Sequence, residues 1–310
     1  MDSRQLRYFA AVYEQGNVSR AADICNVAQS ALSHHVANLE AEFGTPLFVR
    51  QPRGMEPTAA GERLYEHAKL ILKAINAAEK DIRQSGEDVS GDIAIGMAYS
   101  ATKAIGLSMM KTVIARYPKI KLSLTESLSS STLIHLMASE VDLALVYNPP
   151  ADKRLVSEAV LEEEMFCIGT RAVVGDTAEP ITFEELLAMP IIQLRQGIAT
   201  RALLDAPALQ RKLDARANLQ ISSVYAIAEA LLAGLGCSVS TKLVMREQLA
   251  DGSLNARRVV APELLRTLHL CHLANRPATF VMEAMRKIII EMISNEIATG
   301  GWEARPLFRQ

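Results

Sequence analysis

From Ile93 onward, short apolar segments alternate with longer segments of helical periodicity. The first unit joins the apolar run "DIAIGMA" to the amphipathic segment "KAIGLSMMKTVIARY", which ends before Pro118. Such alternation predicts parallel strands covered by helices. A second series begins near "EEEMFCIGT", and a last strand and helix, "TLHLCHLA" and "TFVMEAMRKIIIEMISNEI", follow near the end. We therefore expect two α/β lobes, with the chain crossing between them twice and a small-molecule cleft where they meet.

A single long helix is predicted before this region, from Thr58 to about Ser85. Its apolar residues follow one another at spacings of 4, 3, 4, 3 and 4, which is a heptad pattern. So narrow a stripe favours a partner helix and predicts a dimer; the alternative is a helix that packs on its own domain. The predicted seam consists of Leu64, Ala68, Ile71, Ile75, Ala78 and Ile82. The polar stretch 85–92, with two glycines, predicts a hinge.

Three short helices and a hairpin are predicted before the long helix. A helix over 4–15 is followed by a second one, "RAADIC", which Ser19 is suited to cap. The third helix follows a tight turn and reaches Phe43, which gives a helix-turn-helix arrangement. Residues 47–57 then predict a small β-hairpin, or wing, with proline and glycine in its turn.

The third helix has two different faces. One is the predicted core face, made by apolar residues at helical spacing: Leu32, Val36, Leu39 and Phe43. The other face has short hydrogen-bonding side chains and no Lys or Arg: Gln29, Ser30, Ser33 and His34. The first sixty residues hold five basic and six acidic side chains, a sum of −1. A nucleic-acid partner must therefore be argued from geometry, because the charge does not indicate one.

The order of these segments resembles that of the LysR-type bacterial transcriptional regulators, and the resemblance covers almost the whole chain. It is most specific in the first sixty residues, in Leu6 to Phe9, the pair Ala21-Ala22, and the motifs "AQSALS", "LEAEFGTPLFVR" and "TAAGE". Within the family, the sequence is most similar to the nitrogen assimilation control type. Two positions depart from the family pattern: Ser30 replaces a usual proline, and Thr241 stands where "LLP"-like sequences are common.

The resemblance implies an α/β architecture with three functional segments. A winged helix-turn-helix would occupy residues 1–58, and a linker and dimerisation helix with its hinge would occupy residues 59–90. A two-lobed effector domain similar to periplasmic binding proteins would occupy residues 91–310. Lobe one of that domain would span about 91–162 and 267–298, and lobe two about 163–266.

The resemblance also gives the polar face of the third helix a partner, double-stranded DNA. Gln29 and Ser33 lie one turn apart, as do Ser30 and His34, and such side chains can bond to base edges in the major groove. On the wing, Arg50 and Arg53 would reach phosphates or the minor groove. A homodimer or homotetramer would multiply these contacts and offset the low net charge.

A small-molecule effector is expected in the cleft between the lobes. Hydroxyl side chains gather where strands lead into helices, in "YSAT" (99–102), "LSSST" (128–132), "GIAT" (197–200) and "SSV" (222–224). Helix N-termini favour anions, so we expect a small organic anion, such as a carboxylate, held by Ser100, Thr102, Ser129, Thr200 and Ser223. The alternative is that these hydroxyls only cap their helices. No arginine is clearly placed in this predicted site, so a neutral or weakly bound ligand is a further alternative.

Other functions have weaker support in the sequence. Cys25, Cys167, Cys237 and Cys271 form no CxxC pair, so we expect inert thiols, no metal, no cofactor and a cytoplasmic location, with a redox sensor as the alternative. The acidic run Glu162 to Glu164 is expected to be a solvated edge. No catalytic motif or membrane segment is visible. An enzyme or a solute-binding protein built on the two-lobed domain remains the competing interpretation.

Overall fold

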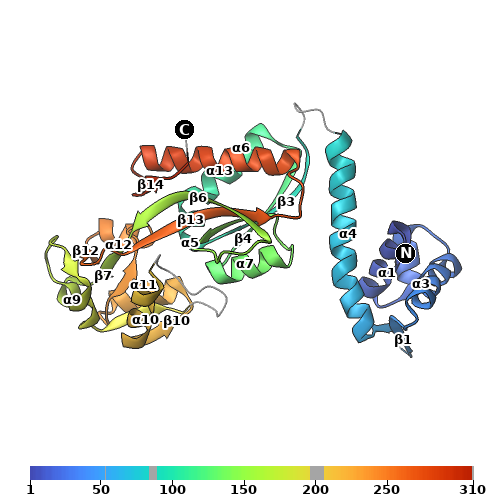
Figure 1. Ribbon diagram of the computed structural model, residues 1–310, viewed down its shortest axis with the longest axis horizontal. Coiled ribbons are helices and arrows are strands. Elements are labelled where there is room, and N and C mark those ends of the chain that lie inside the picture. The colour runs from blue at the N-terminus through green and yellow to red at the C-terminus, as the bar shows by residue number, and fades with distance from the viewer. Residues whose placement is uncertain (53, 84–88, 196–205, 309–310) are drawn as a thin grey trace. The chain divides into compact units, whose positions relative to one another are not determined.

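The computed structural model describes all 310 residues except 53, 84–88, 196–205 and 309–310 (Figure 1). The chain forms two compact units, Met1–Gln84 and Ser85–Gln310. The first contains helices α1 to α4 and a hairpin, and the second contains the remaining helices and strands. None of the described helices is long and apolar enough to cross a membrane.

Three helices build the core of the first unit: α1 (Ser3–Gln15), α2 (Val18–Cys25) and α3 (Gln29–Phe43). Their positions confirm the predicted helix-turn-helix. The helices end at Gly16, Asn26 and Gly44, which all adopt the left-handed conformation that stops a helix. Apolar side chains from all three helices meet in one buried cluster, which includes Leu6, Phe9, Ala22, Leu32 and Leu39.

The predicted cap of α2 was wrong by two residues. The N-cap is Asn17, whose side-chain oxygen accepts hydrogen bonds from the backbone N–H groups of Ser19 and Arg20, at 2.9 and 3.1 Å. Asn satisfies the free donors of a first turn as well as Ser does, and here it stands two residues nearer the end of α1. The Ser19 hydroxyl instead donates to Gln29 on α3, at 3.0 Å.

Asn17→Ala should therefore destabilise the first unit by about 1 kcal/mol, because two N–H groups of α2 lose their acceptor. In hydrogen exchange followed by mass spectrometry, the amides of α1 to α3 should exchange about fivefold faster. Ser19→Ala is the matched control and should change exchange much less. A larger effect from Ser19→Ala than from Asn17→Ala would contradict the assigned cap.

The predicted wing is confirmed as an antiparallel pair, β1 (Phe48–Gln51) and β2 (Gly54–Pro57), in which Arg50 faces Met55. Glu40 of α3 fixes the base of this hairpin. Its carboxylate accepts hydrogen bonds from the backbone N–H groups of Leu47 and Phe48, at 2.7 and 3.1 Å. The prediction of Phe43 as a core residue was wrong. Its side chain is 44% exposed, because α3 ends at this residue and no other element covers it.

The long helix α4 (Ala59–Arg83) has two different halves. In its first half, Leu64 and Ala68 pack into the core of their own unit, and Tyr65 donates a hydrogen bond to Glu14 of α1 at 2.8 Å. In its second half, Ile71 is 37% and Ile82 85% exposed. The helix thus packs on its own domain at one end, as the alternative interpretation had it, and leaves an apolar stripe uncovered at the other.

The second unit has two lobes, and the first lobe is built on a six-stranded sheet in the order β14-β6-β13-β5-β3-β4. Helices α6 and α13 cover one face of this sheet and α7 the other (Figure 1). The strands are β3 (Gly91–Met97), β4 (Ile120–Glu126), β5 (Leu143–Tyr147), β6 (Leu155–Glu164), β13 (Leu265–Leu273) and β14 (Arg305–Pro306). The helices are α5 (Tyr99–Ala101), a π-helical turn (Thr102–Gly106), α6 (Leu107–Arg116), α7 (Ser129–Met137) and α13 (Phe280–Ala298).

The expectation of a purely parallel sheet was wrong. β3 pairs in parallel with β4 and β5, but β13 pairs antiparallel with β5 and β6. The reason is topological. β6 carries the chain toward the second lobe and β13 brings it back, so the two neighbouring strands must run in opposite directions (Figure 1). These two strands are the two crossings that were expected between the lobes.

The second lobe has its own sheet, in the order β11-β7-β12-β8, and a parallel pair formed by β9 and β10. Its apolar core is separate from that of the first lobe. The strands are β7 (Phe166–Gly169), β8 (Ile181–Thr182), β9 (Ile191–Leu194), β10 (Ala217–Ile221), β11 (Ser238–Ser240) and β12 (Asn255–Val260). The helices are α8 (Arg171–Val174), α9 (Phe183–Leu187), α10 (Pro207–Arg216), α11 (Val224–Leu232) and α12 (Arg246–Ala250).

Candidate functional site

Helix α3 presents a polar face to solvent in the first unit. Gln29, Ser30 and His34 are exposed and Ser33 is half-buried, while the opposite face of the helix is buried in the core. The Ser19 hydroxyl holds the amide of Gln29, and Asn38 contacts His34 Nε2 at 3.1 Å. No side chain caps the first turn of α3, so its N–H groups also point outward without a side-chain acceptor. The helix thus offers a rigid surface of hydrogen-bonding groups.

Of the two arginines predicted for the wing, the structure describes one, Arg50. Arg50 lies on β1 with an exposed side chain. Arg53, the second predicted wing cation, lies outside the described residues.

A cavity of about 60 Å³ lies between the two lobes of the second unit. The first lobe contributes the start of α5, the start of α7, and residues of β5 and β13. The second lobe contributes residues of β9, β11, α11 and the turn after β11. The lining residues are Ala98, Tyr99, Ser100, Leu128, Ser129, Tyr147, Leu194, Val224, Ile227, Ser238, Val239, Ser240, Val244, Met245 and Arg266.

Two of the five hydroxyl residues predicted for this site line the cavity. The Ser100 hydroxyl lies 2.9 Å from the Tyr147 hydroxyl, and Ser129 Oγ accepts the backbone N–H of Tyr147 at 3.0 Å. Tyr147 thus joins both serines in one buried polar group. Burial raises the pKa of the Tyr147 phenol above its usual value, although the charge of Arg266 opposes the shift. The phenol therefore stays neutral and can donate a hydrogen bond.

Two of the other three predicted hydroxyl residues, Thr102 and Ser223, do not line the cavity. Ser223 caps α11 and accepts the N–H of Ala226 at 3.2 Å, which is the alternative role considered for these hydroxyls. Thr102 donates to the backbone oxygen of Ala98 at 3.4 Å, inside its own helical turn. Thr200 lies outside the described residues.

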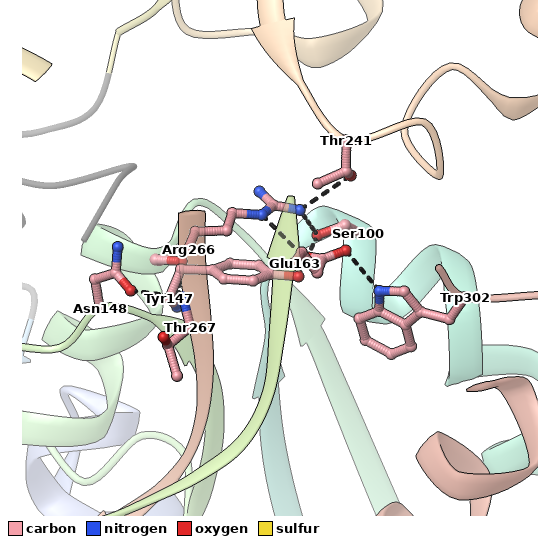
Figure 2. Close-up of polar contacts among 9 residues, drawn as sticks. Ser100, Tyr147, Asn148, Glu163, Thr241, Arg266, Thr267 and Trp302 are labelled. Atoms are coloured by element: carbon pink, nitrogen blue, oxygen red, sulfur yellow. Dashed lines mark hydrogen bonds and ion pairs between the residues drawn. The ribbon is translucent and has the colours of Figure 1, made fainter. Parts of the chain in front are cut away.

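An arginine that the sequence analysis missed lies at the centre of the site. Arg266 on β13 is only 7% exposed and is paired with Glu163 on β6, which is 1% exposed. Arg266 Nε donates to Glu163 Oε2 at 2.8 Å, and Arg266 Nη2 donates to Ser100 at 3.1 Å and to Thr241 at 3.2 Å (Figure 2). The guanidinium also lies over the Tyr147 ring, 3.8 Å from its centre.

Glu163 connects this arginine to the C-terminal segment. Its second carboxylate oxygen accepts the indole N–H of Trp302 at 2.6 Å (Figure 2). Burial acts to lower the pKa of Arg266, but the Glu163 carboxylate, through its charge and its hydrogen bond, and the Tyr147 phenol together raise it. The expected solvated edge at Glu162 to Glu164 was therefore wrong for Glu163. Glu162 and Glu164 do form surface ion pairs, with Arg305 and Arg258.

A signal for this pair was present in the sequence. Arg266 occupies an inward position of β13, in alternation with Leu268 and Leu270, and Glu163 follows Leu161 in the same way on β6. The two residues are direct partners in the antiparallel register. Opposite charges at the inward positions of two apolar strands indicate a buried pair, but only once the strands are known to be neighbours.

Comparison with known proteins agrees with this architecture. Residues 3–62 match the family described as "Bacterial regulatory helix-turn-helix protein, lysR family", and residues 86–294 match the "LysR substrate binding domain". The nitrogen assimilation regulatory protein nac of Klebsiella aerogenes is 29% identical over 95% of this chain and 96% of its own length. This similarity agrees with the subgroup expected from the sequence.

Solved structures of full-length regulators share the fold. Full-length OxyR from Pseudomonas aeruginosa superposes with a TM-score of 0.67 at 19% identity, over 94% of both chains. Full-length CbnR, solved in complex with its target DNA, superposes with a TM-score of 0.63 at 19% identity, over 95% of this chain and 99% of that chain. The chain therefore belongs to the LysR family and is a DNA-binding transcriptional regulator.

Proposed function

We propose that this regulator reads its operator through the polar face of α3, set in the major groove. The observation that carries the proposal is that Gln29, Ser30, Ser33 and His34 lie together on the solvent side of a helix whose other side is locked in the core. Such side chains can bond to base edges, and a rigid helix presents them in one register. Arg50, and Arg53 outside the described residues, would contact the DNA backbone beside them.

Gln29→Ala should lower the affinity for the operator by about 1–3 kcal/mol while nonspecific binding stays the same, because a base contact is lost. Arg50→Ala is the contrasting variant. It should weaken binding to all sequences and make the affinity less dependent on salt, because a phosphate contact is lost. Titrations of operator and scrambled DNA at several salt concentrations separate the two effects. Unchanged discrimination in Gln29→Ala would show that this helix face does not read the bases.

We further propose that the chain acts as a homodimer, or as a tetramer made of two dimers. The support is the uncovered half of α4, where Ile71, Ile75, Ala78 and Ile82 continue the heptad spacing beyond the part that packs on its own unit. The proposed seam therefore begins at Ile71, since Leu64 and Ala68 are already in a core. In this proposal, residues 1–58 read DNA, 59–90 join two chains, and 91–310 respond to the effector.

The cavity between the lobes is the proposed effector site, and a small organic anion is the proposed effector. Support comes from Ser100 and Ser129, which combine hydroxyl groups with helix starts, and from the positive charge of Arg266 in the same wall. A ligand that touches both lobes would favour one lobe arrangement over others and so change how the DNA-binding units are held. A solute-binding protein would use the same cavity but would not bind an operator, which separates the two functions experimentally.

A further inference from the structure

One edge of the Arg266 guanidinium has no partner among the described residues. Nε donates to Glu163, and Nη2 donates to Ser100 and Thr241, which leaves the two N–H groups of Nη1 without an acceptor (Figure 2). The side chain is more than nine-tenths buried and forms part of the cavity wall. Buried guanidinium groups are normally fully hydrogen-bonded, so an open edge at a cavity is a place for an acceptor from a ligand.

The number of negative charges that such a ligand can carry is limited by the charges of the site. Arg266 is the one ionised side chain in the described lining of the cavity. Its charge is already matched by Glu163, whose carboxylate lies directly behind it at 2.8 Å from Nε. A first negative charge on a ligand would gain the bonds to Nη1. A second one would meet no further cation among the described lining residues and would be repelled by Glu163 in a region of low dielectric constant.

The remaining walls favour a short apolar body. The second lobe contributes two serines, Ser238 and Ser240, and six apolar residues to the lining: Leu194, Val224, Ile227, Val239, Val244 and Met245. One water needs about 10–15 Å³ of such space, so the cavity of about 60 Å³ has room for roughly four to six non-hydrogen atoms. A ligand of this size could place a polar end at Arg266 and an apolar end against these six side chains.

We propose that Arg266 recognises the effector and that Glu163 limits the ligand to one negative charge. The site would then bind a small monocarboxylate with a short apolar tail. The carboxylate accepts from Arg266 Nη1 and from the Ser129 hydroxyl, and the tail lies against the second lobe. This inference rests on the effector site proposed above. It adds which residue recognises the ligand and why a dicarboxylate is rejected.

Three probes of six non-hydrogen atoms each test this selection on the unmodified full chain: butyrate, its neutral amide butyramide, and the dicarboxylate oxalate. Binding is measured by ligand-observed NMR titration. The emission of Trp302, the single tryptophan of the chain, is a second readout because its indole N–H bonds to Glu163. Butyrate should bind about tenfold or more tightly than either other probe, since only butyrate has one charge to pair. Equal binding of butyramide, or no binding of butyrate, would overturn the proposal.

Glu163→Gln tests the charge limit; it keeps the size of the side chain but only one of its two acceptor oxygens. The variant leaves Arg266 without its counterion, so oxalate should gain about tenfold in affinity and approach butyrate. Glu158→Gln is the matched control on the same strand, because Glu158 pairs with Arg286 and does not line the cavity. Unchanged rejection of oxalate in Glu163→Gln would overturn the role of Glu163. Operator binding by the same preparations tests the regulator function separately, so failure of one proposal is distinguishable from failure of the other.

Discussion

Glu163→Ala is expected to lower the free energy of unfolding of the second unit by about 3–5 kcal/mol. The variant would leave the Arg266 charge buried without its counterion and the Trp302 indole N–H without its acceptor. Both groups are removed from water, so neither recovers a hydrogen bond from solvent at low cost. Urea unfolding followed by Trp302 fluorescence measures the change directly, because that tryptophan lies in the affected network.

Two further variants test whether the loss of stability comes from the buried ion pair or from a surface ion pair. Glu162→Ala, one residue away, removes a surface partner of Arg305 and should cost less than about 1 kcal/mol. Replacing Glu163 and Arg266 together by leucine should recover much of the stability, because no unpaired charge remains. A loss below about 1 kcal/mol in Glu163→Ala would contradict the buried ion pair as a structural element.

Ile71→Glu combined with Ile75→Glu is expected to convert the protein to a monomer. The two charges would have to be buried against a partner helix, and the heptad contact would lose its apolar residues at the same positions. Binding to paired operator half-sites should fall about 100-fold or more, because each unit would then bind independently. Light scattering measures the mass, and titration of paired and single half-sites measures the loss.

The matched control is Asn76→Glu, which adds a charge on α4 at an exposed position outside the heptad seam. It should remain an oligomer and bind paired half-sites as the unmodified protein does. A monomeric unmodified protein, or a double variant that keeps the oligomer, would contradict the proposed seam.

Features set by local periodicity were predictable from the sequence. The spacing of Leu6, Phe9 and Val12 depends only on helix geometry, and so do the ends at Gly16 and Gly44. The hairpin was predictable for the same reason, since its turn residues and its two strands are adjacent in the chain. Phe43 shows the limit of this reasoning: helical spacing from Leu39 points it inward, but burial requires a covering element that is absent there.

The central pair of the candidate site was not predictable in the same way. Glu163 stands in the acidic run Glu162 to Glu164, where composition alone favours a solvated surface. Arg266 lies about a hundred residues away, and only the antiparallel register of β6 and β13 places it opposite Glu163. Ser129 and Ser223 illustrate the same limit, because both begin helices, yet only Ser129 lines the cavity and Ser223 is a cap.

The most direct test of the account is a binding titration with DNA from upstream of the chain's own coding sequence, compared with a scrambled fragment of the same composition. A retarded complex is expected on the upstream fragment, with protection of paired half-sites in footprinting. The affinity should exceed that for the scrambled fragment by about 1,000-fold at physiological salt. Gln29→Ala should reduce this ratio while the chain stays folded. Equal affinity for both fragments, with the unmodified protein folded and oligomeric, would contradict operator recognition by α3.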